Sequence, residues 1–468
     1  MKLKRIFFLA AMLALTSNAQ EKKEKKADAS FENYAYSDAI NSYENLVNKG
    51  FSSEEIFKNL GNANYLNANY KEAAEWYGKL MNLNEATVDP EYLYKYAQTL
   101  KTLQKYKESD AWMLKFEAAK KQDNRSELFI QRADYIQKIK ENSGRYNIKN
   151  STINSSVSDF APSINGSQLI FSSARDSGIT TKNIHKWNSM PFLDLYIVSI
   201  SESGAVDETI PFSKNINKRT HESSTAFTKD GQTIYFTRNN STNGSFDRDK
   251  EGISRLKIYK AKLVNNQWKN ITELPFNSDN YSVAHPTLSP DETKLYFASD
   301  MPGTLGASDI FMVTINKDGT YGTPENLGPN INTEARETFP FVTNSNKLYF
   351  ASDGHPGLGG LDIFAIDLET LSKGYIQNVG MSVNSEEDDF SFILDEINSK
   401  GYFASNRKNG KGSDDIYITS DSGEKFITCN TNDSVEIRFD NVKKFETTAE
   451  GVNLPDNNAL FLDNTNNN

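Results

Sequence analysis

Cysteine is almost absent from this chain, since Cys429 is the only one among 468 residues. A lone cysteine cannot form an intrachain disulfide, so apolar cores must stabilise the fold. We interpret Cys429 as a small apolar residue and not as a nucleophile. Histidine is also scarce, and the four residues share no close spacing, which argues against zinc ligation. These shortages exclude a disulfide-stapled domain and disfavour a zinc site.

An excess of positive charge is missing as well, because the net charge is −10 and no basic block follows the extreme N-terminus. The sequence therefore predicts no nucleic-acid partner. No segment after the N-terminus is apolar enough to cross a membrane. The apolar run Ile6–Leu15 follows three basic residues and precedes a Ser-Asn-Ala cleavage site. This pattern is typical of a signal peptide, placed at residues 1–19, and it predicts an exported protein.

An aromatic phrase recurs five times, and an Asp-led phrase follows most copies. The aromatic copies are Leu169–Ser173, Ile234–Thr237, Leu295–Asp300, Leu348–Asp353 and Gly401–Asn406. Each unit starts near an apolar residue followed by Asn: Ile153-Asn154, Ile216-Asn217, Phe276-Asn277, Ile331-Asn332 and Val383-Asn384. Each unit can be divided into four strands, and one such sheet cannot bury its own faces. Several must stack around an axis, so residues 146–428 are predicted to form a WD40-like β-propeller.

Five blades are expected, and the last one has no clear fourth strand of its own. The segment Tyr146–Asn150 precedes the first blade and is predicted to supply that strand and close the ring. Six blades remain an alternative if residues 421–450 form a further, degenerate blade. Residues 429–468 are otherwise interpreted as a short tail, with at most one or two strands near Ser434–Phe439 and then disorder.

The N-terminal part is predicted to be helical. After a charged linker at 20–29, residues 30–142 repeat the pattern Tyr-x2-Ala-x3-Tyr from Tyr36 and Tyr70, with a weaker copy from Tyr106. This spacing is similar to the tetratricopeptide repeat, in which a small residue lets two helices pack closely. The fold class is thus an N-terminal α-solenoid followed by an all-β propeller. Exposed aromatics of a concave helical groove are candidate partner contacts: Tyr65, Trp76 and Trp112. For each aromatic, the alternative is that it only fills the core between helices.

A second candidate site comes from aligning the first strand of each blade. The alignment places Asp159, Glu222, Val283, Glu337 and Asp388 at one position, and four of these five are acidic. The carboxylates are predicted to form a rim on the central channel that could hold a metal ion or a partner's basic side chains. The alternative is solvated strand-edge residues. The Asp that opens the Asp-Ile-Phe phrase is instead predicted to accept bonds from the loop before it, in Asp309, Asp362 and Asp415.

The order of these parts carries a family resemblance. The chain resembles the PorE-like, OmpA-family periplasmic proteins of Bacteroidota. The resemblance rests on a signal peptide, tetratricopeptide-like helices and blades that read Leu295–Asp300 and then Asp309-Ile310-Phe311. The resemblance implies an envelope protein, with type IX secretion, gliding or outer-membrane proteins of the PorP/SprF type as associations. Family members usually continue into a β-domain and a peptidoglycan-gripping OmpA-like domain. The residues after Cys429 are too few for either, so direct peptidoglycan binding is not expected.

We therefore expect a non-enzymatic periplasmic scaffold, near the outer membrane, with protein partners and with no cofactor, no metal and no catalytic residue. One alternative is a carbohydrate-binding or glycosidase-type propeller, since propeller glycosidases use paired carboxylates. Another is a truncated relative of a peptidoglycan-anchoring OmpA-family protein.

Overall fold

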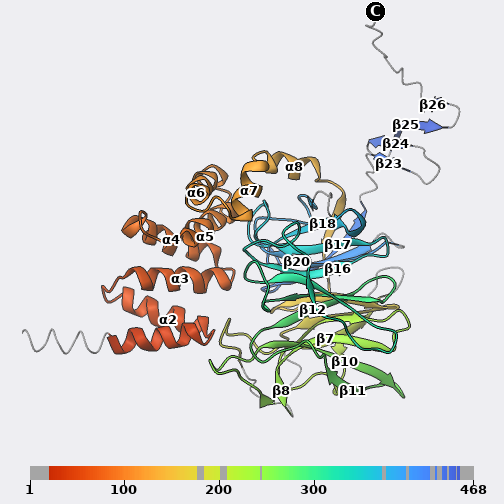
Figure 1. Ribbon diagram of the computed structural model, residues 1–468, viewed down its shortest axis with the longest axis horizontal. Helices are drawn as coiled ribbons and strands as arrows, with labels where there is room; N and C mark the ends of the chain where they lie inside the picture. Colours follow the sequence, from red (N-terminus) through yellow and green to blue (C-terminus); the bar gives the residue numbers. More distant parts are fainter. Residues whose placement is uncertain are drawn as a thin grey trace, which may run out of the picture.

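A layer of helices packs on one end of a five-bladed β-propeller, which confirms the predicted fold class (Figure 1). The computed structural model describes residues 21–175, 184–200, 208–242, 245–371, 376–396 and 400–421, together with four strands between 427 and 453. The signal-peptide prediction at 1–19 lies outside the described residues. Among the described residues, no helix is long and apolar enough to cross a membrane.

The helical layer begins earlier than predicted, because residues 21–32 are helical and are not an extended linker. Their Ala27 is fully buried in the core of the layer, and Asp28 accepts a hydrogen bond from the Tyr43 hydroxyl. The following helices are α2 (Tyr36–Val47), α3 (Glu54–Leu66), α4 (Tyr70–Asn84), α5 (Pro90–Thr102), α6 (Tyr106–Ala119), α7 (Asn124–Gln131) and α8 (Tyr135–Glu141). The charge-rich composition of this segment concealed the apolar positions that hold it against α2.

Small residues set the spacing inside the layer. A Cβ atom on Gly61 of α3 would lie 2.3 Å from Cε1 of Tyr77 on α4, so the tyrosine ring occupies the space that glycine leaves. Tyr43 and Tyr77, the last residues of the first two repeat patterns, are both fully buried. For these aromatics, packing between helices is the correct interpretation.

The propeller has four-stranded blades whose second strand carries the aromatic phrase. The first blade consists of β2 (Asp159–Asn165), β3 (Gln168–Ser173), β4 (Asp194–Ser199) and β5 (Ile210–Pro211), and the second of β6 (Glu222–Phe227), β7 (Thr233–Asn239), β10 (Leu256–Val264) and β11 (Gln267–Glu273). The third consists of β12 (Val283–Leu288), β13 (Lys294–Ser299), β14 (Asp309–Thr314) and β15 (Glu325–Asn326), and the fourth of β16 (Glu337–Val342), β17 (Lys347–Ser352), β18 (Asp362–Asp367) and β19 (Gln377–Asn378). The fifth consists of β20 (Asp389–Asp395), β21 (Lys400–Ser405), β22 (Asp415–Asp421) and β1 (Tyr146–Asn150). The short strands β8 (Ser241–Thr242) and β9 (Ser245–Phe246) pair beside the second blade. The phrase's central phenylalanine is at most 1 % exposed in every blade.

Strand β1 closes the ring, as the sequence predicts. It pairs antiparallel with β22, so a strand from before the first blade completes the fifth blade. The recurring Asn has a related role in each blade. Its side-chain amide accepts from the N–H and donates to the C=O of one residue in the third strand, at 2.8–3.1 Å. These amides fix the connection that leads into each new blade.

The prediction for the tail was wrong in its strand count. Four strands form a sheet of their own, in the order β23 (Ile427–Cys429), β24 (Val435–Phe439), β25 (Val442–Thr448) and β26 (Gly451–Asn453). This sheet is not a sixth blade, because the fifth blade already packs on the first, with β2 in contact with β20 and β21. Strands β23 and β26 have only three residues each, which is too short for an alternation signal.

Candidate functional site

The aligned carboxylates of the first strands are buried and do not form an open rim. Asp159, Glu222 and Glu337 are each 0 % exposed. In the fifth blade the equivalent residue is Asp389 and not Asp388, because Asp389 pairs with Ser405 as Asp159 pairs with Ser173. The two errors have different causes. The strands were aligned on a proline that the fifth blade does not have, which shifted the register there by one residue. Burial of the carboxylates by the loops depends on the folded chain, so the strand sequences did not show it.

These carboxylates fasten the loop that enters each blade. Each accepts a hydrogen bond from the backbone N–H four residues earlier, in Asp159, Glu222, Glu337 and Asp389. Three also pair with an arginine, and those pairs are Asp159–Arg175, Glu222–Arg238 and Asp389–Arg407. Because groups of the protein itself already bond to these carboxylates, they are poorly suited to bind a partner or a metal ion, or to act as the acid and base of a glycosidase.

Glu337 differs because no ion pair to it occurs among the described residues. Its carboxylate accepts bonds from the hydroxyls of Thr333 and Ser352 at 2.8 and 2.6 Å. Burial raises the pKa of Glu337 to about 8, although these bonds oppose the shift. The protonated form of Glu337 therefore stabilises the folded state more than the charged form does.

The Asp of the Asp-Ile-Phe phrase has the predicted structural role. Asp309 accepts from the N–H groups of Leu305 and Gly306, and Asp362 accepts from those of Leu358 and Gly359. Asp415 accepts from Lys411 and Gly412 in the same way. Each carboxylate holds the preceding loop in place.

Tyr65 contacts the propeller and not an open groove, so its prediction as an exposed contact was wrong. The residue is 4 % exposed, and its hydroxyl donates to Oδ2 of Asp353 at 3.0 Å. Tyr70 donates to Oδ1 of Asp388 at 2.5 Å, which places that predicted rim residue in the same interface. Arg336 lies beside them and donates from Nε to Asp353 at 2.9 Å. The helices cover this surface where they pack on the ring. The sequence of one helix does not show which of its residues will be covered in this way.

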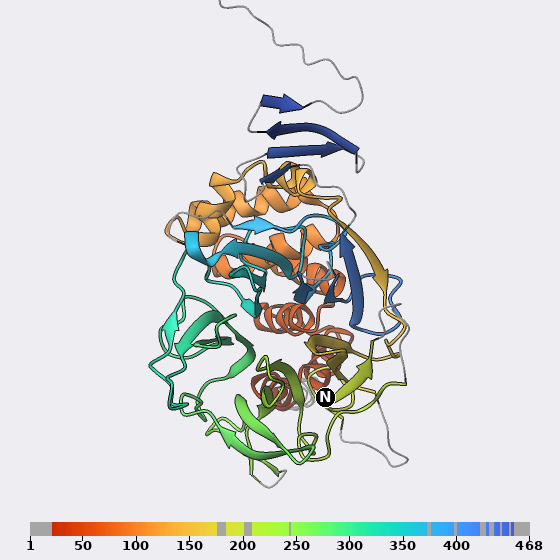
Figure 2. The same ribbon diagram turned by 90° about the vertical axis from the view of Figure 1, so that its right-hand side faces the viewer.

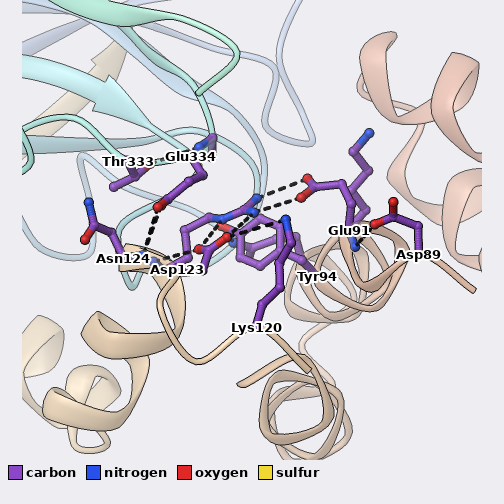
Figure 3. A network of polar contacts seen from close by, with 12 residues as sticks. Asp89, Glu91, Tyr94, Lys120, Asp123, Asn124, Thr333 and Glu334 are labelled. Carbon is purple, nitrogen blue, oxygen red and sulfur yellow. Dashed lines mark hydrogen bonds and ion pairs between the residues drawn. The ribbon is translucent and has the colours of Figure 1, made fainter. Parts of the chain in front are cut away.

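A buried arginine ties the layer together where it meets the ring. Arg125 of α7 is 1 % exposed and donates to Asp123 and Glu91 at 2.8–3.0 Å, while its guanidinium lies 4.1 Å from the Tyr94 ring centroid. Figure 3 shows Glu91 and Asp123 converging on this point, with Glu334 of the propeller nearby. Glu334 accepts from the N–H of Asn124 with both oxygens, at 3.0 and 3.1 Å. Burial alone would raise the pKa of Asp123, but the bonds and charge of Arg125 hold it below its usual value.

Trp76 and Trp112 remain accessible on the helical layer. Both indoles are partly buried, and Lys79 and Lys115 lie over them with Nζ 3.8 Å from the ring centroids. Trp76 and Trp112 occupy equivalent positions of α4 and α6, because each stands the same number of residues after the tyrosine that begins its helix. Each packs on an aromatic residue of the preceding helix, which is Phe57 of α3 for Trp76. The α5 residue Tyr96 packs on Trp112 at 5.1 Å, and its hydroxyl approaches Gly78 of α4. Lys115 also pairs with Glu85, which follows α4, at 2.6 Å. We call this the tryptophan surface (Trp76, Lys79, Tyr96, Trp112, Lys115).

The central channel of the propeller holds a cavity of about 410 Å³. It is lined by the first strand of every blade and reaches the turns that follow those strands, at Gly166, Lys229, Glu292, Asn344 and Asp395. The helices contact the opposite end of the ring, at residues such as Glu334 and Asp388, which precede the first strands. Figure 2 looks onto the open end, with the helices behind the ring.

Every first strand carries a bulge at the same place in the channel. The bulged residues have positive φ values between 35° and 58°, and they are Ala161, Ser224, His285, Phe339 and Ser391. Because all five blades share the bulge, it belongs to the architecture and not to one reactive residue. It brings Ser224 and His285 of neighbouring blades together, with Oγ and Nδ1 2.6 Å apart. The sequence pattern did not predict this pair, although both residues stand two positions after the aligned carboxylate position.

Aromatic rings close the helix-side end of the channel. Phe160, Phe339 and Phe390 come from three blades, and their ring centroids are 5.0–6.2 Å apart. His285 stacks on Phe339 at 3.7 Å. Burial lowers the pKa of His285 to about 3, so this imidazole is neutral at ordinary pH. Within the described residues, no group of three or more His, Cys, Asp or Glu side chains could hold a metal ion.

Comparison with known proteins adds little to this geometry. No protein-family model matches the sequence, and no curated protein matches it. Among solved structures, the chain is similar to TolB from Acinetobacter baumannii, at 14 % identity and TM-score 0.30, covering 54 % of this chain and 52 % of that one. It is also similar to alpha-L-arabinofuranosidase from Lactobacillus brevis, at 12 % identity and TM-score 0.37, over 61 % and 94 %. A family 117 glycoside hydrolase from Zobellia galactanivorans aligns at 11 % identity and TM-score 0.36, over 59 % and 90 %. The similar part thus spans about half of the TolB chain. Sequence identities and TM-scores this low are no evidence of a shared function.

Proposed function

We propose that this chain is a non-enzymatic interaction scaffold of the cell envelope, in which the helices and the propeller act as one body. The observation that carries the proposal is the tryptophan surface. Two partly exposed indoles, each beneath a lysine, stand at equivalent positions of α4 and α6. Trp is enriched among the residues that dominate protein interfaces, because it buries a large area at a small entropic cost.

The neighbouring residues indicate what kind of partner fits. Leu83 of α4 is 55 % exposed and lies two turns after Trp76 on the same face of the helix. Lys79 and Lys115 add positive charge above the rings. A protein segment with apolar side chains flanked by carboxylates complements such a surface.

Two observations favour a scaffold over an enzyme. The aligned carboxylates are consumed by loop bonds and arginine pairs, so they do not supply a free acid and base. Tyr65 and Tyr70 join the helices to the ring through hydrogen bonds to Asp353 and Asp388, and the guanidinium of Arg336 in the ring lies over the Tyr65 side chain. The periplasmic location, and an association with type IX secretion, gliding or an outer-membrane partner, are proposed from the leader sequence and the family resemblance.

Site-specific photo-crosslinking in cells tests the proposal. A photoreactive amino acid at Lys79, beside Trp76, is expected to trap a discrete envelope protein. The matched control places the same group at Lys317, an exposed turn residue of the third blade. Changing both Trp76 and Trp112 to Ala should abolish the product at Lys79 while the protein stays folded. Identical products from both positions, or from the double variant, would contradict a specific partner.

A further inference from the structure

We propose that the central channel is a binding site for a neutral mono- or disaccharide. The site is distinct from the tryptophan surface and independent of the proposed scaffold role. Its volume of about 410 Å³ lies in the lower part of the range typical of small-molecule sites, about 300–1,000 Å³.

The shape of the channel limits what can enter. The side chains of Phe160, Phe339 and Phe390 meet across it, and the helix residues Tyr65 and Tyr70 cover the propeller beyond them. The opposite end reaches the turns after the first strands. The ligand therefore enters from one side, and a long chain cannot thread through.

The chemistry of the wall is polar and neutral. Small hydroxyl groups and one imidazole come from four of the five blades, and they are Ser163, Ser224, Thr225, His285, Thr287 and Ser391. The first strand is the edge strand of every blade, so five strand edges meet at the channel. Such edges offer backbone donors and acceptors. Apolar faces of Phe341 and of the wall's prolines lie between these groups.

A saccharide matches this combination better than a peptide does. Sugar rings offer many neutral hydroxyl groups around apolar C–H faces, which suit hydroxyl-lined and aromatic walls. A peptide entering a one-ended pocket would have to insert its charged terminus or a tight turn. Among the described residues that line the cavity around the Ser224–His285 pair, none has a charged side chain. A charged terminus placed there would lose its hydration without compensation. The charges of Lys229, Glu292 and Asp395 lie at the mouth.

Titration calorimetry and saturation-transfer NMR on the full chain test the proposal. The probes are galactose, glucose, N-acetylglucosamine, cellobiose and maltose, with an end-blocked tri-alanine peptide as the competing class. Saturable binding of at least one sugar is expected. Ala226→Phe should abolish it, because Ala226 lines the cavity and a phenyl ring would fill the space. Ser224→Ala should weaken binding about tenfold, since it removes one polar anchor.

Two variants serve as controls. Ser223→Ala removes a hydroxyl from the adjacent residue, which does not line the cavity, and should change affinity less than about twofold. Trp112→Ala should leave sugar binding unchanged, so failure of the scaffold proposal cannot be mistaken for failure of this one. Circular dichroism and thermal melting confirm that each variant is folded. The proposal is overturned if no probe sugar binds, if binding survives Ala226→Phe, or if only the blocked peptide binds.

Discussion

The side chain of Asn154 forms two hydrogen bonds with the backbone of Ile416, a residue 262 positions further along the chain. The Asn154 amide oxygen accepts from the Ile416 N–H, and its nitrogen donates to the Ile416 carbonyl, both at 2.8 Å. Ile416 belongs to β22, the strand that β1 joins. This contact joins the first blade to the last.

Asn154→Leu is expected to lower the free energy of unfolding by about 2 kcal/mol or more, because two backbone groups lose their partners in a buried place. Hydrogen exchange should accelerate in β1 and β22. The matched control is Asn277→Leu, which removes the same two bonds from Ile258 in a blade away from the closure. Equal acceleration of β1 by both variants would show that Asn154 has no special role in closing the ring.

Gly61→Ala should destabilise the helical layer by about 1–3 kcal/mol through overpacking, since the new methyl group meets the Tyr77 ring at 2.3 Å. Tyr77→Leu in the same chain should recover part of the loss, because it removes the obstructing ring. Chemical denaturation followed by far-ultraviolet circular dichroism measures both. A Gly61→Ala protein as stable as the parent would contradict the close approach of α3 and α4.

Arg125→Met should cost about 3–5 kcal/mol, because Asp123 would remain buried without its positive partner. Glu91→Gln should cost much less, at most about 1 kcal/mol, because Glu91 is 33 % exposed and water can replace the lost charge. Unfolding by urea distinguishes the two variants. Similar losses in both would mean that burial of Asp123 is not the source of the energy.

Stability should fall between about pH 4.5 and pH 8 through Glu337. Its folded pKa is raised to about 8 from a usual value of 4.5, so the folded state holds a proton that the unfolded state releases. The contribution is fully present below pH 4.5 and is lost as the pH rises through the folded pKa. Glu337→Gln should reduce the slope of the unfolding free energy against pH by roughly 1 kcal/mol per pH unit in this range. Urea unfolding at several pH values measures this slope, and an unchanged slope would refute the role of Glu337.

Repetition made the propeller predictable. The aromatic second strand and the Asn of each blade recur with the same local chemistry, so five copies revealed the sheets and even the closing strand β1. The Asp of the third strand was correctly assigned for the same reason, since its partners lie only three or four residues away.

The candidate site was less predictable because exposure depends on contacts distant in sequence. Tyr65 and Trp76 looked alike in the sequence, yet Tyr65 bonds to Asp353, 288 residues away, whereas Trp76 stays partly exposed. The Ser224–His285 pair joins two blades and forms only when both bulges are in place. The one-residue error at Asp388 arose from aligning strands by proline, while the structure aligns them by pairing with the second strand.

The closing strand has a consequence for synthesis of the protein. Asn154 leaves the ribosome 262 residues before Ile416, a delay of roughly 13 to 52 seconds at about 5–20 residues per second. During that time β1 has no strand to pair with, and an unpaired edge readily joins other chains. Closure of the ring is therefore the last pairing step that synthesis permits, and β1 stays unpaired until the last blade is made.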